Sequence, residues 1–291
     1  MLPHLSAAHA PLTCEVAACN EFGQPVRVSI PAERALTVYV DKRELVTLMT
    51  LGAQPELLVL GYLCNQRLLA SAHEIESITV DWDVSAAAVK TRSGIANIEA
   101  KTAQRVVTTG CGQGSVFGGL MDAVDQIKLP LDARITQSQL YALVNTIRLK
   151  ETTYKSAGSV HACALFETTS NAVELRMFVE DVGRHNAMDT IAGWLALQTA
   201  PLDDAATRVF YTTGRLTSEM VIKSAQMGVP IVVSRSGITQ MGHQVAEQIS
   251  LCAIGRATHT RFVCYTHPQR LVWQPELAGS QPASKLSVVA A

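Results

Sequence analysis

Helices and strands alternate along the second half of this chain, and that alternation limits the fold more than any other feature. Apolar spacing after Pro130 predicts helices over residues 136–149, 185–198, 217–227 and 239–249. It predicts strands over residues 160–166, 173–179, 208–213, 230–234, 252–257 and 262–266. Repeated β-α-β units of this kind predict an α/β domain with a largely parallel sheet covered by helices.

The first half of the chain has a different pattern. Short β-branched runs fill residues 26–40 and 75–107, with one helix candidate over residues 55–64 between them. We therefore predict a strand-rich α+β domain over residues 23–129 and an α/β domain over residues 130–273. Residues 1–22 and 274–291 lack periodicity and are predicted to be loose tails.

Composition narrows the class of protein. With 48% hydrophobic residues in 291, the chain can bury a full core, and its formal net charge of −1 argues against general binding to nucleic acid or membrane. Residues 208–270 nevertheless carry seven basic against two acidic residues, which suggests a discrete anionic ligand or a solvated basic face. The chain lacks a signal-like start and a long apolar run, so we expect a cytoplasmic protein.

The run over residues 180–189, Glu-Asp-Val-Gly-Arg-His-Asn-Ala-Met-Asp, gathers six hydrogen-bonding or charged side chains around Gly183. It lies where a predicted strand meets a predicted helix. Backbone N–H groups and the helix dipole favour an anion at such a junction, and Arg184 and Asn186 add directed donors. The alternative is a helix cap in which Glu180 and Asp181 pair with Arg184 and nothing binds.

Two further loops also follow predicted strands, Gly214-Arg215 and Ser234-Arg235-Ser236-Gly237. Ligands of α/β sheets bind at the carboxyl ends of the strands, so these loops and residues 180–186 are predicted to line one mouth. The segment from Thr213 to Lys223 is typical of an anion cradle, although a plain capped helix explains it as well.

A second candidate centre is the loop Gly110-Cys111-Gly112-Gln113-Gly114. Three glycines leave the Cys111 sulfur open and let backbone N–H groups converge on it, which stabilises a thiolate. A nucleophile or a sulfur carrier needs that combination. The alternative is a turn in which Cys111 is a small filler.

The other six cysteines indicate no comparable chemistry. Cys163, Cys252 and Cys264 lie in apolar strands and are predicted to be core residues. Seven cysteines at irregular spacing do not suggest a disulfide framework, and none forms a Cys-x-x-Cys pair, so we expect no structural metal.

Together these segments resemble the formate dehydrogenase accessory sulfurtransferase family, FdhD. The resemblance extends over residues 26–272, and residues 180–189 are its most specific element. Its other motifs are Thr109-Gly110-Cys111-Gly112, Val160-His161-Ala162, Thr213-Gly214-Arg215, Ser218-Glu219-Met220 with Lys223, Gly228-Val229-Pro230, Ser234-Arg235-Ser236 and Tyr265-Thr266-His267-Pro268.

The resemblance implies a sulfurtransferase that accepts persulfide sulfur from a cysteine desulfurase and passes it to a molybdenum cofactor, in its bis-guanine-dinucleotide form, for formate dehydrogenase. It also implies a homodimer and a three-layer C-terminal domain similar to the cytidine deaminase fold. The active cysteine of the family corresponds to Cys111. The C-terminal cofactor-binding segment of the family corresponds to Phe262, Val263, Cys264, Tyr265, Thr266 and His267.

The chain departs from the family pattern in two places. Many members have a second cysteine three residues after the first, where Gly114 stands here, so a relay between two loop cysteines is not expected. The usual Thr-Pro-Gly turn is replaced by Leu51-Gly52-Ala53-Gln54-Pro55, which alters a predicted partner surface.

We accordingly predict that Cys111 carries a persulfide. The phosphate and guanine-nucleotide contacts are assigned to Arg184, His185, Asn186, Gly214, Arg215, Ser234 and Arg235. Two other functions fit the same residues. One is a chaperone that holds the cofactor without a sulfur step, and the other is a cysteine hydrolase that uses Cys111 with His161 or His185.

Overall fold

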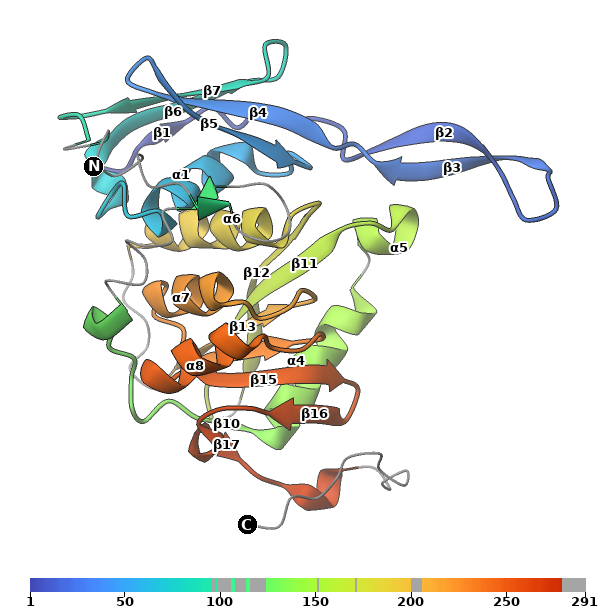
Figure 1. Cartoon of the computed structure of the whole chain (residues 1–291), viewed down its shortest axis with the longest axis vertical. Helices are drawn as coiled ribbons and strands as arrows, with labels where there is room; N and C mark the ends of the chain where they lie inside the picture. The colour runs from blue at the N-terminus through green and yellow to red at the C-terminus, as the bar shows by residue number, and fades with distance from the viewer. Residues whose placement is uncertain are drawn as a thin grey trace.

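The computed structural model describes residues 1–95, 98, 106–107, 114–115, 124–150, 152–170, 172–199 and 206–278. Within these residues the chain forms two larger sheets, one built from each half of the sequence (Figure 1). Helices α1 (Pro55–Asn65) and α6 (Arg184–Ala196) lie between the first sheet and the rest of the molecule (Figure 1). The predicted change of architecture between the two halves is therefore present in the structure.

The N-terminal sheet has five strands in the order β1-β6-β7-β4-β5. These strands are β1 (His4–Leu5), β4 (Arg34–Val40), β5 (Arg43–Thr50), β6 (Ile75–Asp81) and β7 (Ala86–Thr91). One face packs on α1 (Pro55–Asn65), which has proline in its first turn, where a missing N–H costs nothing. This sheet and α1 enclose one apolar core.

A long two-stranded ribbon projects from the N-terminal sheet (Figure 1). Strand β2 (Thr13–Cys19) pairs antiparallel with β3 (Pro25–Pro31). Because β1 and β2 fall within residues 1–22, the prediction of a loose N-terminal tail is wrong. The ribbon is exposed or half-exposed along its length, so its strands need no continuous apolar run and its sequence looks irregular.

The C-terminal sheet has six strands in the order β12-β11-β13-β14-β15-β16. They are β11 (His161–Thr168), β12 (Val173–Asp181), β13 (Thr207–Thr212), β14 (Ile231–Ser234), β15 (Cys252–Thr258) and β16 (Arg261–Cys264). Only the β13–β14 and β14–β15 pairings are parallel, so the prediction of a largely parallel sheet is corrected to a mixed sheet. The connections β11–β12 and β15–β16 are too short for a parallel crossover, which needs about a dozen residues.

Helices cover both faces of this sheet and give three layers. The covering helices are α4 (Gln137–Leu149), α6 (Arg184–Ala196), α7 (Ser218–Gln226) and α8 (Gln240–Gln248). Helices α6, α7 and α8 pack on one face, and α4 packs on the other. The likeness to the cytidine deaminase fold stays a prediction.

The two halves meet where α1 crosses α6. A Cβ on Gly61 would lie 1.6 Å from the Asp189 carbonyl oxygen, and a Cβ on Gly193 would lie 1.9 Å from the Leu57 carbonyl oxygen. Only glycine allows the two backbones to approach this closely. The two sheets on either side of the boundary predicted near residue 130 are therefore connected by close packing of α1 against α6.

Two short strand pairs and a small helix lie outside these sheets. Strand β10 (Ile135–Thr136) pairs with β17 (Leu271–Val272), β8 (Val106–Val107) pairs with β9 (Gly114–Ser115), and α5 (Thr153–Ala157) precedes β11. Gln274 exchanges backbone-to-side-chain hydrogen bonds of 2.9 Å with Ser138 and Gln137. The C-terminal tail predicted from residue 274 is thus anchored to α4 at its first residue.

Candidate functional site

The run over residues 180–189 forms the predicted strand-to-helix junction. Strand β12 ends at Asp181, Gly183 is the N-cap of α6, and Arg184 is its first residue. The Asp181 carboxylate accepts a hydrogen bond of 2.9 Å from the Gly183 N–H, which closes the turn between strand and helix.

Part of this run holds the two halves of the chain together. Asp181 also accepts hydrogen bonds from the Thr50 hydroxyl and from the Leu51 N–H, both at the end of β5. The Asn186 amide nitrogen donates to the Met49 carbonyl at 2.7 Å and to Asp181 at 2.9 Å. The structure therefore places Asn186, one of the predicted nucleotide contacts, in the joint between the halves and not on an open surface.

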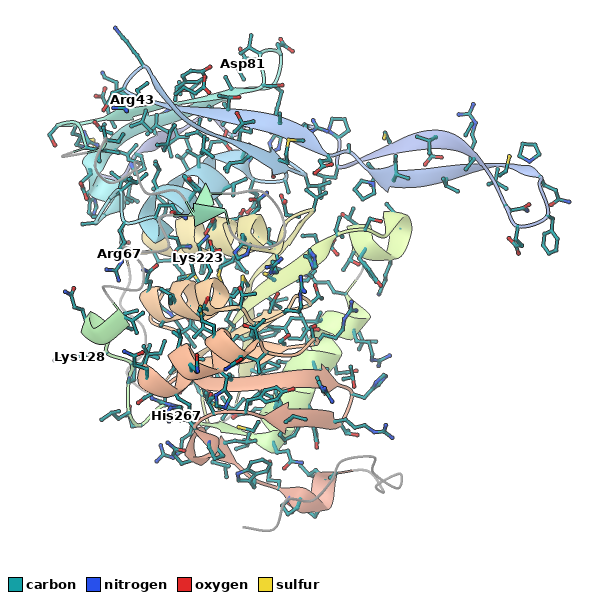
Figure 2. All side chains as sticks on the ribbon, viewed as in Figure 1. Arg43, Arg67, Asp81, Lys128, Lys223 and His267 are labelled. Atoms are coloured by element: carbon teal, nitrogen blue, oxygen red, sulfur yellow. The ribbon has the colours of Figure 1, made fainter. Side chains whose placement is uncertain are left out.

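A buried charge network lies under the same helix. Lys223, which is labelled in Figure 2, donates through its ammonium to both Asp189 oxygens, at 2.9 and 3.0 Å, and lies 3.4 Å from Glu219. Asn65 on α1 donates to Asp189 at 2.7 Å. Lys223 and Asp189 are both 0% exposed. The sequence suggested an anion cradle near Lys223, but the structure gives this lysine internal carboxylate partners.

His185 also belongs to this buried layer. Its Nδ1 lies 3.7 Å from Glu219 Oε1. Burial, opposed by Glu219 and aided by Lys223 and Arg184, lowers the pKa of His185 to about 3. The imidazole is therefore neutral at pH 7 and is enclosed by protein, although the sequence assigned it to the cofactor site.

Three arginines follow the carboxyl ends of strands β12, β13 and β14. The pKa of His161 is lowered first by burial and then by the charges of Arg184, Arg235 and Arg215. Arg184 begins α6 after β12, and Arg215 and Arg235 lie in the loops after β13 and β14; the three segments meet at Gly214, which Arg184 and Ser234 both contact. Arg215 and Arg235 are exposed, whereas Arg184 is buried.

Small residues make room for these arginines. A Cβ on Gly214 would lie 2.6 Å from Arg184 Cδ, so glycine lets the Arg184 side chain cross the loop. The Ser234 hydroxyl donates to the Gly214 carbonyl at 2.7 Å and accepts from the Ser236 N–H at 2.9 Å. Gly214 and Ser234, both predicted cofactor contacts, thus shape the loops that carry the arginines.

A cavity of about 290 Å³ opens beside the arginines, on the α4 face of the sheet. Its apolar walls include Val144, Ile147, Val160, Phe178 and Tyr211. Its polar lining includes Arg148, Lys155, Arg235, His259, Thr213 and Glu180. Apolar walls with several cations suit a flat ring that carries an anionic group.

The acidic and aromatic lining of this cavity is fixed by local contacts. The Glu180 carboxylate accepts hydrogen bonds from the N–H groups of Thr153, at 2.6 Å, and Tyr154, at 3.2 Å, at the start of α5. The Arg235 guanidinium lies 5.5 Å from the centre of the Tyr154 ring, a cation–π contact. The Glu180 carboxylate is thus engaged by backbone N–H groups at the start of α5, while the Arg235 side chain remains exposed.

The predicted C-terminal segment lies elsewhere, on and beyond the outer strand β16. Phe262 stacks on Trp273 with ring centres 5.8 Å apart, and a Cβ on Gly255 would lie 2.7 Å from the Tyr265 ring. The Thr266 hydroxyl bonds the Leu251 carbonyl at 2.7 Å, and His267 Nε2 contacts the Glu247 carbonyl at 3.1 Å. Among the described lining residues of the 290 Å³ cavity, none belongs to residues 262–267.

Cys111, Gly110 and Gly112 lie outside the described residues, so the predicted nucleophile loop stays a prediction. Gly114 lies in the short strand β9. Cys163 and Cys252 are buried, as predicted, and Cys264 is half-buried. Burial raises the pKa of both Cys64 and Cys163 to about 12, so neither provides a thiolate at neutral pH.

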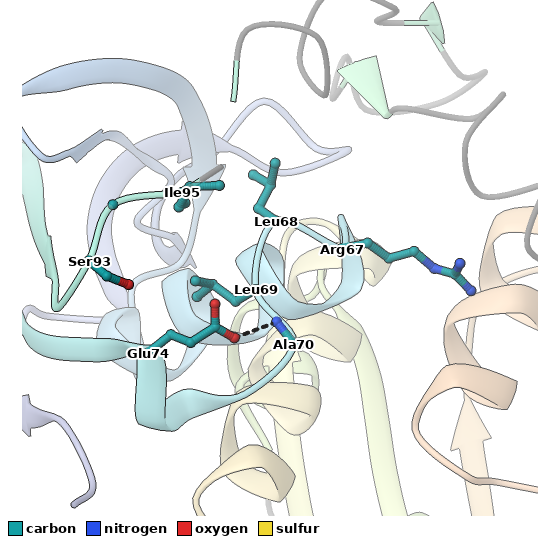
Figure 3. Close-up of a pocket in the computed structure, with 8 residues that line it drawn as sticks. Arg67, Leu68, Leu69, Ala70, Glu74, Ser93 and Ile95 are labelled. Atoms are coloured by element: carbon teal, nitrogen blue, oxygen red, sulfur yellow. Dashed lines mark hydrogen bonds between the residues drawn. The ribbon is translucent and has the colours of Figure 1, made fainter. Parts of the chain in front are cut away.

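A second cavity, of about 600 Å³, lies in the N-terminal part (Figure 3). It is lined by Arg67, Leu68, Leu69, Ala70, Glu74, Ser93, Gly94 and Ile95. Glu74 accepts a hydrogen bond of 2.8 Å from the Ala70 N–H, and the Arg67 side chain points away from the other labelled residues (Figure 3). The acidic group of this cavity is thus engaged in a local turn.

The described residues include no cluster of three or more His, Cys, Asp or Glu side chains that could hold a metal ion. No described helix has both the length and the apolar character that a membrane crossing requires.

Comparisons with known proteins agree on one family. A family model described as the FdhD/NarQ family matches residues 31–272, so the ribbon β2–β3 largely precedes the match. The sulfur carrier protein FdhD of Bacillus subtilis is 31% identical over 245 residues, which cover 82% of this chain and 88% of that protein. The Bacillus licheniformis protein of the same name is 32% identical over 241 residues, with the same coverage.

A solved structure has the same fold. It is the crystal structure of a protein described as a formate dehydrogenase accessory protein from Desulfotalea psychrophila. The TM-score is 0.69, and the match covers 90% of this chain and 100% of that chain at 22% identity.

Proposed function

Because the chain belongs to the FdhD/NarQ family, we propose that it is a sulfur carrier needed to activate a formate dehydrogenase. The names of its relatives support this role. We further propose that the sulfur travels as a persulfide on Cys111. The donor is a cysteine desulfurase and the acceptor is a molybdenum cofactor in the bis-guanine-dinucleotide form.

The loading step follows from thiol chemistry. The Cys111 thiolate attacks the outer sulfur of a desulfurase persulfide, a new S–S bond forms, and the desulfurase thiolate leaves. Electrons and atoms balance without an external oxidant. Such a step needs a reduced thiol, which agrees with a cytoplasmic protein whose cysteines do not suggest a disulfide framework.

The contact between the segments that bear Arg184, Arg215 and Arg235 is the observation that carries the cofactor part of the proposal, since Arg184 packs on Gly214 and Ser234 donates to the Gly214 carbonyl. Guanidinium groups pair well with phosphate oxygens, and the adjoining cavity has apolar walls suited to a flat base. We assign the phosphates of the cofactor to Arg215 and Arg235 at the mouth and to Arg184 behind them. A homodimer is part of the same proposal.

Sulfur mapping tests the carrier role. The full-length protein is incubated with a cysteine desulfurase and cysteine, digested without reductant and analysed by mass spectrometry. We expect one extra sulfur on the Cys111 peptide and none on the peptide of Cys163, whose buried thiol serves as the internal control. Extra sulfur confined to other cysteines would exclude Cys111 as the carrier.

A maturation assay separates the carrier from a holding chaperone. Cys111→Ala should abolish activation of the formate dehydrogenase, because no other group replaces the persulfide. Full activity with Cys111→Ala would favour the chaperone, which binds the cofactor without a sulfur step.

Calorimetry tests the nucleotide site with GDP as the probe. Arg215→Ala should weaken binding by about 1.5 to 3 kcal/mol if the guanidinium makes a charged hydrogen bond to phosphate. Arg27→Ala, an equally exposed arginine on the ribbon β2–β3, is the matched control and should bind GDP like the parent. Equal affinity of Arg215→Ala and parent would exclude this role for Arg215.

A further inference from the structure

Two cysteine sulfurs approach each other across the outer strands of the C-terminal sheet, where Cys264 pairs in register with Ile254 and Cys252 is its diagonal neighbour. Strands β15 and β16 pair antiparallel, and the sulfur of Cys252 lies 3.8 Å from the sulfur of Cys264. Cys252 is buried and Cys264 is half-buried. An S–S bond is about 2.05 Å long, so the two sulfurs must move about 1.8 Å closer to form one.

The surroundings of the pair make the outer cysteine the more acidic of the two. A hydrogen bond from Cys252 lowers the pKa of Cys264, and the same contact together with burial raises the pKa of Cys252. Buried Arg270 lies close enough for its charge to lower the pKa of Cys252 in part. A more accessible thiol with a lowered pKa beside a buried thiol is the arrangement in which one cysteine attacks and the other resolves.

We propose that Cys252 and Cys264 are a redox-active dithiol that closes to an internal disulfide when the protein meets a peroxide or a low-molecular-weight disulfide. With a disulfide, the Cys264 thiolate attacks one of its sulfurs and releases one thiol. Cys252 then loses its proton, attacks the mixed disulfide at Cys264 and releases the second thiol. The protein loses two protons and two electrons, which reduce the reagent to two thiols.

The position of the pair gives the disulfide a structural consequence. Strand β16 is the outer strand of the sheet, and among the described strands it pairs only with β15. A Cys252–Cys264 bond would tie this strand covalently to its neighbour. Thr258 and His259, at the far end of the same hairpin, line the 290 Å³ cavity, so oxidation would stiffen one wall of that cavity. Disulfides in reducing compartments are mostly transient and redox-sensing, which suits a reversible bond.

Differential alkylation of the folded full-length protein tests this proposal. After treatment with oxidised glutathione, we expect a linked Cys252–Cys264 peptide that has lost two hydrogens and is restored by dithiothreitol. The linked protein should melt roughly 5 °C higher than the reduced protein, because the bond restricts the unfolded chain. Cys163→Ser, which removes a buried thiol elsewhere in the sheet, should form the link like the parent.

Variants of the pair make the test decisive. In Cys252→Ser, Cys264 should stop at the glutathione adduct, and in Cys264→Ser neither the adduct nor the link should form at Cys252. The proposal fails if the exposed Cys14 reacts with glutathione while the Cys252–Cys264 link never forms. It also fails if Cys264 links to a cysteine other than Cys252. Sulfur loading of Cys111 under reducing conditions does not depend on this pair, so the two proposals can fail separately.

Discussion

On one face of the six-stranded sheet, beneath α6, α7 and α8, charged side chains are enclosed and paired with one another. On the other face, around α4, they stand at the rim of a cavity. Lys223 on the first face is 0% exposed and contacts Asp189 and Glu219. Arg235 on the second face is exposed and packs on the Tyr154 ring. The first arrangement holds the fold together, and the second leaves positive charge available to a ligand.

The run over residues 180–189 contributes to both arrangements. Asp181 and Asp189 face the joint with the N-terminal half, where Thr50 and Asn65 contact them. Arg184 lies with the arginines near His161. A polar motif can therefore serve packing and ligand binding at once, and its residues must be tested one by one.

Removing the buried lysine should have the largest effect. Lys223→Met leaves Asp189 and Glu219 in the interior without their cation, and breaking a buried pair in this way costs about 3 to 5 kcal/mol. Urea unfolding followed by circular dichroism measures the free energy of unfolding. Lys90→Met is the matched control, since Lys90 makes an exposed 2.8 Å pair with Glu76, and pairs of that kind contribute about 0 to 1 kcal/mol. Similar losses in both variants would contradict the difference between enclosed and exposed charge.

The glycine joint should come next. Gly61→Ala places a methyl group 1.6 Å from the Asp189 carbonyl oxygen, so α1 must move away from α6. Overpacking of this kind costs about 1 to 3 kcal/mol, and we expect the upper end because the obstructing atom belongs to the backbone. In the control Gly237→Ala the nearest atom lies 3.9 Å away, and the free energy of unfolding should change little. A stable, unchanged Gly61→Ala protein would show that the two helices slide apart easily.

The enclosed histidine should make stability depend on pH. The pKa of His185 is about 3 in the folded protein against about 6.5 in the unfolded chain, so the unfolded state binds the extra proton as the pH falls below 6.5. This contribution is present above pH 6.5 and is lost progressively toward pH 3. At pH 4.5 the loss is about 2 to 3 kcal/mol, from two units at about 1.36 kcal/mol each.

Comparison with His185→Gln isolates that contribution from the carboxylates, which titrate in the same range. The variant should lose less stability than the parent between pH 7 and pH 4.5, as measured by urea unfolding at both pH values. Parallel pH profiles for the two proteins would mean that His185 is protonated in the folded state.

Local signals predicted the elements of the second half well, whereas their pairing depended on the whole chain. Thr136 and Gln139 form a capping box, and helix α4 begins at Gln137. The direction of β12 could not be predicted from its own residues, because it follows from the short connection to β11. Prediction also failed for the ribbon β2–β3, whose strands have no buried face to impose a pattern.

For the candidate site, the positions of the loops could be predicted from the sequence, but the partners of individual side chains could not. The convergence of the Arg184, Arg215 and Arg235 loops follows from their places after strands, which sequence periodicity reveals. The partner of Lys223 could not be predicted, because Asp189 reaches it only when α6 and α7 pack side by side. For the same reason Asn186 looked like a ligand contact, although its partner is the Met49 carbonyl in the other half of the chain.

Removing a rim cation should have the smallest effect on stability. Arg235→Met deletes an exposed guanidinium whose described contact is the Tyr154 ring, and exposed cation–π contacts contribute about 0.5 to 1 kcal/mol. Affinity for GDP should nevertheless fall by about 1.5 to 3 kcal/mol if this charge binds phosphate. Arg176→Met is the control, because Arg176 is paired with Glu174 at 3.0 Å and lies outside the lining of the 290 Å³ cavity. Urea unfolding and GDP calorimetry on the same samples therefore separate a charge that stabilises the fold from a charge that binds a ligand. A loss of stability as large as that of Lys223→Met, or an unchanged affinity, would show that Arg235 serves the fold and not a ligand.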